Sequence, residues 1–308
     1  MRPHRIYLVA CSMAATTVFS PGSAMAQKFG PWGEPVSAES FGSTSPALNT
    51  SATEGCPILD PYTGDLYFAS DREGGEGGLD IWRAPWGNGN WGTPENLGPP
   101  INSVTNDYCP TPSRGNRLFF VSRRDDPMGD IYVSRRGPNG YRTPERLPDT
   151  INSDAQEWSP SFYEDDGDDV LFFSSTRNGN QDIFVSINMG PAIAVSELNT
   201  DADDARPNVS RDGLEMVFDT NRGGGAPDIW TSTRASTSDP WRAPVPIAQV
   251  NSEAGESRAS MSWDGTMLVF GSTRAGGEGS SDIYVSTRQK MGGPKTIDLS
   301  EIPPLDAR

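Results

Sequence analysis

Residues 118–135 read LFFVSRRDDPMGDIYVSR, and this stretch carries the two signals that decide the fold. Its first part is short, aromatic and apolar and ends in arginine, which is typical of a β-strand. A loop with proline and glycine leads to the second part, DIYV, and this order indicates a hairpin. The same pattern recurs at intervals of about fifty residues, in LYFASDR (66–72), LFFSSTR (171–177), MVFDTNR (216–222) and LVFGSTR (268–274). Such repetition is typical of repeat architectures.

Two further segments complete each repeat. An acidic residue precedes each LYF-type run, and a turn separates the two, clearest at Asp212-Gly213, which is a strong hairpin signal. A fourth segment follows the DI-aromatic run, as in residues 91–97. Each repeat is therefore predicted to be a four-stranded antiparallel meander. One meander cannot bury both of its apolar faces, so copies stack around an axis. We predict an all-β fold, a five-bladed β-propeller.

The N-terminal segment Trp32-Gly33-Glu34-Pro35 resembles a fourth strand without a blade of its own. We predict that it supplies the outer strand of the last blade and closes the ring, so that no sheet edge stays open. The alternative is that Pro294–Ile302 forms that outer strand and the N-terminal segment belongs to an incomplete sixth blade.

The first residues predict export. An apolar stretch from Ile6 to Phe19 follows two arginines and ends in small residues, which is the pattern of a secretory signal peptide cleaved before Gln27. A lipoprotein anchored through Cys11 is the alternative. The predicted division is a signal peptide at 1–26, a closing strand and linker at 27–53, propeller repeats at 54–288 and a C-terminal strand or tail at 289–308. The predicted location is periplasmic or secreted.

Charge and composition exclude several functions. The net charge is −16, and removal of residues 1–26 changes it to 23 minus 41, or −18. This acidity disfavours nucleic acid and anionic membranes as partners, and no further segment is apolar enough to span a membrane. The single histidine, His4, lies in the signal peptide, so mechanisms that need an imidazole are excluded. We expect a monomer.

The repeated motif resembles the TolB-like, WD-like β-propeller repeat of secreted bacterial proteins, whose pattern is S-x-D-G, then L-x-F-x-S-x-R, then D-I-Y. The resemblance covers residues 54–288 and recurs five times. It implies a cell-envelope propeller used for binding, although a six-bladed TolB-like propeller remains an alternative architecture.

The repeated arginines and aspartates are predicted to be structural, because a site used once has no reason to be copied five times. Each pair is expected to close a hairpin through a bidentate contact. The pairs are Arg72 with Asp80, Arg124 with Asp130, Arg177 with Asp182, Arg222 with Asp228, and Arg274 with Asp282.

The acids that start the inner strands are the predicted ligand-binding residues at the channel mouth. They are Glu54, Asp107, Glu157, Asp204 and Glu256. Two residues further on, the repeats carry Cys56, Cys109, Ser159, Arg206 and Arg258. The two arginines are included in the predicted site because they make one side of the channel cationic. The alternative is that they only neutralise neighbouring acids.

Two other features carry weaker hypotheses. An oxidising compartment permits a disulfide between Cys56 and Cys109, which occupy the same position in adjacent repeats. Asp165, Asp166 and Asp168 resemble a calcium loop, but they lack the spacing of an EF-hand, so a solvated hairpin is preferred and no cofactor is predicted.

Together these features predict a binding or scaffold module for an envelope protein or a cell-wall component, and not an enzyme. The alternative is a carbohydrate-active enzyme, a glycoside hydrolase that uses channel carboxylates and needs no histidine.

Overall fold

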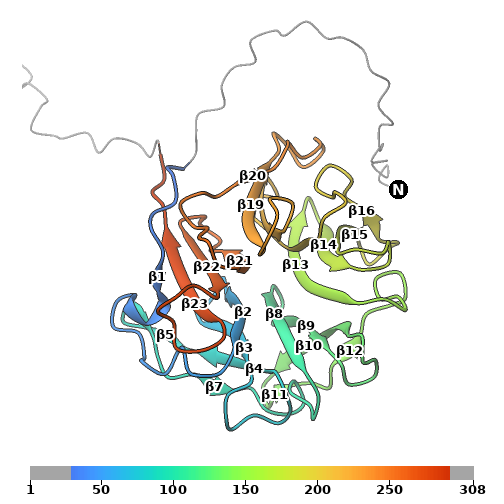
Figure 1. Ribbon diagram of the computed structural model, residues 1–308. Coiled ribbons are helices and arrows are strands. Elements are labelled where there is room, and N and C mark those ends of the chain that lie inside the picture. Colours follow the sequence, from blue (N-terminus) through green and yellow to red (C-terminus); the bar gives the residue numbers. More distant parts are fainter. Residues whose placement is uncertain (1–28, 292–308) are drawn as a thin grey trace, which may run out of the picture.

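Five antiparallel sheets surround a central channel in the computed structural model, which describes residues 29–291 (Figure 1). This confirms the predicted five-bladed β-propeller. The predicted signal peptide, the anchor at Cys11 and the alternative strand at Pro294–Ile302 lie outside the described residues. Within residues 29–291, no helix is long and apolar enough to cross a membrane.

The blades follow one another along the chain, and each begins with the strand that lines the channel. Blade 1 contains β2 (Glu54–Leu59), β3 (Leu66–Ser70), β4 (Asp80–Ala84) and β7 (Glu95–Asn96), with a small ribbon of β5 (Trp86–Gly87) and β6 (Asn90–Trp91). Blade 2 contains β8 (Asp107–Ser113), β9 (Arg117–Ser122), β10 (Asp130–Gly137), β11 (Gly140–Tyr141) and β12 (Glu145–Arg146). Blade 3 contains β13 (Glu157–Asp165), β14 (Asp168–Ser175), β15 (Asp182–Ile187) and β16 (Ile193–Ala194).

Blade 4 contains β17 (Asp204–Val209), β18 (Glu215–Thr220), β19 (Asp228–Thr233) and β20 (Val245–Pro246). Blade 5 contains β21 (Glu256–Met261), β22 (Met267–Ser272), β23 (Asp282–Thr287) and β1 (Val36–Ser37). The single short 3-10 turn among the described residues, Ala38–Ser40, follows β1.

The ring is closed by the N-terminal segment, as predicted. Strand β1 pairs antiparallel with β23, and Figure 1 shows the two side by side although they lie at opposite ends of the chain. The pairing continues upstream, because the backbone N–H groups of Gly33 and Gly30 donate to the carbonyls of Thr287 and Gln289. No outer edge of blade 5 is therefore left open along this segment.

The core repeats with the blades. The central aromatic of each LYF-type run is fully buried, and so is the isoleucine of each DI-aromatic run. These residues are Phe68, Phe120, Phe173, Phe218 and Phe270, and Ile81, Ile131, Ile183, Ile229 and Ile283. Side chains at alternate positions of a strand point to opposite faces, so each blade presents apolar groups to both neighbours.

An asparagine in each connector joins neighbouring blades. Asn49 accepts the backbone N–H of Ile283 and donates to its carbonyl, at 2.8 and 3.2 Å, so its side chain acts as an extra strand residue. Equivalent bonds join Asn102 to Ile81, Asn152 to Ile131, Asn199 to Ile183 and Asn251 to Ile229.

Candidate functional site

The acids that begin the inner strands have a structural role, because each is buried and bound by groups of the protein. All five have 0 % exposed surface, so they form no anionic ring at the channel mouth. In blade 1, Glu54 accepts hydrogen bonds from Thr50 N at 3.0 Å, Ser70 Oγ at 2.9 Å and Arg72 Nη2 at 2.9 Å. A buried carboxylate is tolerated where donors and a cation surround it in this way.

The repeated arginine pairs with this inner-strand acid. The predicted pairing with the aspartate of the next strand is corrected in all five blades. The observed pairs are Arg72–Glu54 at 2.9 Å, Arg124–Asp107 at 2.8 Å, Arg177–Glu157 at 2.9 Å, Arg274–Glu256 at 3.1 Å, and Arg222–Asp204. Each guanidinium also donates to a connector carbonyl and lies over two aromatic rings, as Arg72 does over Phe68 and Trp82.

The aspartates that begin the third strands have other partners. Asp80 accepts from the Asn96 side chain, Asp130 pairs with Arg146 at 2.6 Å, and Asp182 accepts from Asn178. Asp282 accepts the backbone N–H of Glu278. At Asp228, burial is the main reason that the pKa lies above its usual value, with a smaller effect of the charge of Glu256.

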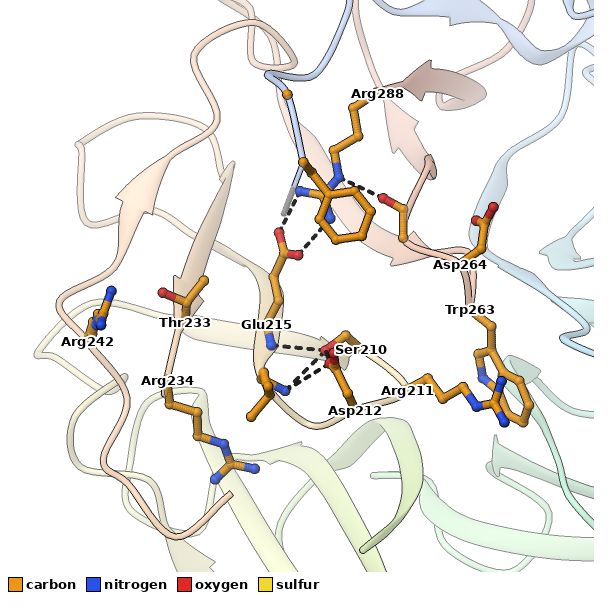
Figure 2. Close-up of a pocket in the computed structure, with 14 residues that line it drawn as sticks. Ser210, Arg211, Asp212, Glu215, Thr233, Arg234, Arg242, Trp263, Asp264 and Arg288 are labelled. Carbon is orange, nitrogen blue, oxygen red and sulfur yellow. Dashed lines mark hydrogen bonds and ion pairs between the residues drawn. The ribbon is translucent and has the colours of Figure 1, made fainter. Parts of the chain in front are cut away.

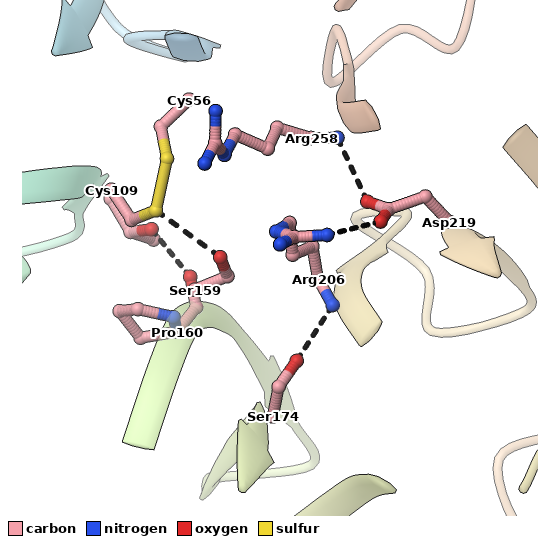
Figure 3. The surroundings of a disulfide bond; sticks show 9 residues. Cys56, Cys109, Ser159, Pro160, Ser174, Arg206, Asp219 and Arg258 are labelled. Atoms are coloured by element: carbon pink, nitrogen blue, oxygen red, sulfur yellow. Dashed lines mark hydrogen bonds and ion pairs between the residues drawn. A yellow bond between two sulfur atoms is a disulfide. The ribbon is translucent and has the colours of Figure 1, made fainter. Parts of the chain in front are cut away.

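The channel wall is asymmetric two residues beyond each acid. Cys56, Cys109, Ser159, Arg206 and Arg258 all have left-handed backbone, with φ between 47° and 58°, and each lies at a β-bulge of its inner strand. The structure joins Cys56 to Cys109 by a disulfide, with the Cα atoms 4.8 Å apart (Figure 3). Ser159 Oγ donates to Cys109 Sγ at 3.2 Å, which completes one wall.

The opposite wall is cationic. Arg206 donates from Nη1 to Asp219, whose other oxygen accepts the backbone N–H of Arg258 at 2.8 Å. Burial raises the pKa of Asp219, and the charge of Arg206 opposes this effect. Figure 3 shows that the Arg258 side chain extends from the region of Asp219 toward Cys56, whereas Arg206 lies closer to Asp219. The structure therefore brings Arg206 and Arg258 together and separates them from the inner-strand acids, which face their own arginines.

The predicted weak calcium loop is the tip of a hairpin. Asp165 and Asp168 are paired across a two-residue turn made by Asp166 and Gly167, both with positive φ. Asp168 accepts a hydrogen bond from the side chain of Asn188. No group of three potential metal-binding side chains gathers within residues 29–291.

A cavity that the repeat pattern did not predict opens beside blades 4 and 5 (Figure 2). It has a volume of about 660 Å³ and lies between the first hairpins of these blades, with Phe29 of the N-terminal segment at its edge. Its carboxyl groups come from Asp212, Glu215 and Asp264. The signal available in the sequence was the residue before each Asp-Gly turn, which is Arg211 in one blade and Trp263 in the next.

Arg288 fixes one side of the cavity. It makes a bidentate ion pair with Glu215, at 2.8 and 2.6 Å, and its Nε donates to the carbonyl of Gly265. The guanidinium also lies over the rings of Phe29 and Trp32, 4.0 and 4.2 Å from their centroids. These contacts join blade 4, blade 5 and the N-terminal segment into one wall.

An aromatic pair fixes the other side. Trp263 is 39 % exposed and meets the 56 % exposed Tyr62 of blade 1 edge to face, with centroids 5.0 Å apart. The guanidinium of Arg211 lies 4.7 Å from the Trp263 ring centroid, and Figure 2 shows the two side chains together at the edge of the cavity. Exposed aromatic rings beside polar groups are typical of binding sites.

Solved structures with the same fold include glycoside hydrolases. A thermostable family-43 glycoside hydrolase matches at 13 % identity, over 80 % of this chain and 92 % of that chain, with a TM-score of 0.56. An α-L-arabinofuranosidase from Lactobacillus brevis matches at 14 % identity, over 82 % and 94 %, with a TM-score of 0.54. Family-62 arabinofuranosidases and an endo-arabinase from Bacteroides thetaiotaomicron also match.

A TolB structure from Acinetobacter baumannii matches at 17 % identity, over 77 % of this chain and 54 % of that chain, with a TM-score of 0.47. A similarity at this level does not establish a family. No family model and no curated protein matches the sequence. The β-propeller is therefore established, whereas the TolB-like resemblance is not confirmed.

The expectation that the protein is not an enzyme is corrected by these structures. The chain has the fold of several glycoside hydrolases, so the fold gives no reason to exclude catalysis. At these identities the likeness shows the fold alone, and the activity has to be argued from the site.

Proposed function

We propose that the chain is a carbohydrate-active protein that takes a saccharide into the cavity beside Trp263. The observation that carries this proposal is a cavity of about 660 Å³ lined by the exposed ring of Trp263, against which Tyr62 packs from outside the lining. This volume lies in the usual range of small-molecule sites. The C–H faces of a sugar ring stack on aromatic rings, while the surrounding guanidinium and carboxyl groups can exchange hydrogen bonds with its hydroxyls.

Glycosidic hydrolysis is the reaction that we assign to this site, because it needs only two carboxyl groups on either side of the bond. Glu215 is held in an ion pair by Arg288. Asp212 and Asp264 instead accept hydrogen bonds from neutral donors of their own turns in blades 4 and 5, and Lys290 lies 4.0 Å from Asp264. We assign the pair to Asp212 and Asp264, which occupy the same position of the two turns that line the cavity. Burial acts to raise the pKa of Asp264, but hydrogen bonds from Ser262 and Thr266 outweigh it, and the pKa is lowered. An ionised Asp264 suits the general base. We assign the second carboxyl role to Asp212, at the equivalent turn position of blade 4.

The inner-strand acids are excluded from this role. Glu157 and Asp204 are fully buried and bound by arginine, so neither can reach a substrate. The predicted route to catalysis through these channel carboxylates is therefore replaced by the cavity carboxylates.

Binding is tested with oligosaccharides of arabinan and xylan, and turnover by the release of reducing ends. Trp263→Ala should weaken binding at least about tenfold, because loss of one well-packed aromatic contact costs more than about 1.4 kcal/mol. Trp86→Ala is the matched control, since Trp86 is 37 % exposed but does not line the cavity. Equal affinity of the two variants would contradict the site.

Asp264→Asn tests the reaction separately. It should abolish turnover while oligosaccharide affinity stays within about twofold, because the amide keeps the shape of the side chain but cannot act as a base. Turnover that survives in both Asp264→Asn and Asp212→Asn would reject the assigned pair.

A further inference from the structure

The cationic wall of the channel contains a guanidinium without an acceptor. Among residues 29–291, the side chain of Arg258 donates no hydrogen bond, and its Nε is buried. Asp219 accepts the side chain of Arg206 and the backbone N–H of Arg258. Within the described part of the chain, the Arg206 guanidinium therefore has a carboxylate partner, whereas the Arg258 guanidinium has none.

Close approach to blade 1 explains where this guanidinium lies. A side chain at Gly55 would place its Cβ 2.7 Å from Arg258 Nη1, so the glycine leaves room for the arginine to extend from blade 5 to the neighbouring blade 1. Burial, with a smaller contribution from the charge of Arg206, lowers the pKa of Arg258 to about 10. The group is still cationic at neutral pH, which leaves one excess positive charge in the channel.

The remaining walls cannot neutralise this charge. The sulfurs of Cys56 and Cys109 are bonded to each other, and the hydroxyl of Ser159 donates to Cys109. The ring of Trp158, over which Arg206 lies at 5.5 Å, brings no negative charge. A cation with a buried donor that has no acceptor is costly, and this arrangement favours an anion.

The available space limits what the anion can be. The cavity between the inner strands measures about 30 Å³, which is the volume of one water molecule in the liquid. The side chain of Arg206 is 17 % exposed and Arg258 is half-buried, so solvent reaches both residues. A planar carboxylate presents two oxygens to the fork of an arginine and needs less depth than a tetrahedral anion.

We propose that Arg206 and Arg258 bind the carboxylate of a small acidic ligand at the centre of the channel, with the body of the ligand outside the narrow part. The fork of Arg258 supplies the free donors, and Arg206 adds charge while it holds Asp219. This site is separate from the cavity beside Trp263, so it does not depend on the proposed saccharide site.

The test is calorimetric titration of the full chain with D-glucuronate, with D-glucose as the neutral counterpart and inorganic phosphate as a tetrahedral anion. Glucuronate should bind, its affinity should fall as salt is added, and glucose should bind at least about tenfold more weakly, because only the acid supplies the anion. Equal binding of glucose and glucuronate, or tighter binding of phosphate, would overturn the carboxylate assignment.

Arg258→Met should reduce glucuronate affinity at least about tenfold, and Arg258→Lys should restore part of it, because lysine returns the charge without the fork. Arg135→Met, which removes an exposed arginine of blade 2, is the control and should leave the affinity unchanged. Unchanged affinity in Arg258→Met would contradict the proposal.

Two further measurements distinguish loss of the channel site from misfolding of the variant and from binding in the cavity beside Trp263. Arg258→Met should melt no lower than the parent chain in the absence of ligand, because it removes a buried charge that has no acceptor. Trp263→Ala should keep glucuronate affinity; loss in this variant with retention in Arg258→Met would move the acid to the saccharide cavity and reject the channel site.

Discussion

The first residue of each inner strand and the residue two places further on lie only a few ångströms apart along the strand, yet they differ completely in use. The first position is an acid in all five blades, always buried and always bound by the arginine that follows the second strand of the same blade. The second carries two bonded cysteines, a serine and two arginines. Uniform positions build the blades, whereas the divergent position gives the channel two unlike walls.

Substituting one of the inner-strand acids, which are present in every blade, should have the largest effect on the free energy of unfolding. Glu157→Ala removes the partner of Arg177 and leaves that guanidinium buried, so the free energy of unfolding should fall by about 3–5 kcal/mol. Glu95→Ala is the matched control, since Glu95 makes an ion pair of similar length with Arg83 but is 61 % exposed. Its loss should be under about 1 kcal/mol. Urea unfolding of both variants checks this difference, and equal losses would contradict a framework role.

Removing the disulfide between Cys56 and Cys109 should lower the free energy of unfolding by a smaller amount. The bridge closes a loop of 53 residues, so the double variant Cys56→Ser with Cys109→Ser should lose about 2–4 kcal/mol of unfolding free energy. Reduction of the parent chain should give the same shift in the urea midpoint. A midpoint that does not respond to reductant would show that the bridge is absent in solution.

Substituting Glu39, an acid outside the repeats, should have the smallest effect on stability. Burial raises the pKa of Glu39, opposed by the Asn49 backbone N–H and reinforced by the neighbouring acid Glu278. A raised carboxyl pKa adds stability at low pH, and this contribution is lost as the pH rises through the folded value. Glu39→Gln should therefore raise the melting temperature at pH 7 by on the order of 1 °C, and at pH 4 the two proteins should melt together. A gain at pH 4 alone would reverse the assignment.

The blades could be predicted because every repeat repeats the same local chemistry. Apolar strands and Asp-Gly turns are short-range signals, and the N-terminal segment, which resembles a fourth strand without a blade of its own, indicated closure of the ring. The outer strand of each blade is only two residues long, although the sequence predicted longer segments.

The arginine partners could not be predicted, because Ser70 is in register with both Glu54 and Asp80. Both acids therefore flank the end of the strand before Arg72. Which of the two acids Arg72 contacts depends on the connector before the blade. The carbonyls of Ala47 and Leu48 in this connector also accept hydrogen bonds from Arg72, on the side of Glu54. This arrangement exists only after the blades have assembled.

The cavity could not be predicted for a related reason. Its wall combines Phe29, Glu215 and Arg288, which lie far apart in the sequence and share no repeat position. The bulge positions were recognised as unlike, but their left-handed backbone and the single carboxylate between the two arginines required the structure.

The pairing of β1 with β23 also sets an order of events during synthesis. Val36 leaves the ribosome long before its partner Val285. Likewise, Asn49 can bind Ile283 only after the 234 residues that separate them have been synthesised. Four blades can acquire their own strands as they emerge, but the fifth completes its sheet only when both distant segments are present. Contacts of such long sequence separation form late and slowly. We therefore expect the pairing of β1 with β23 to form last, after the other four blades have folded.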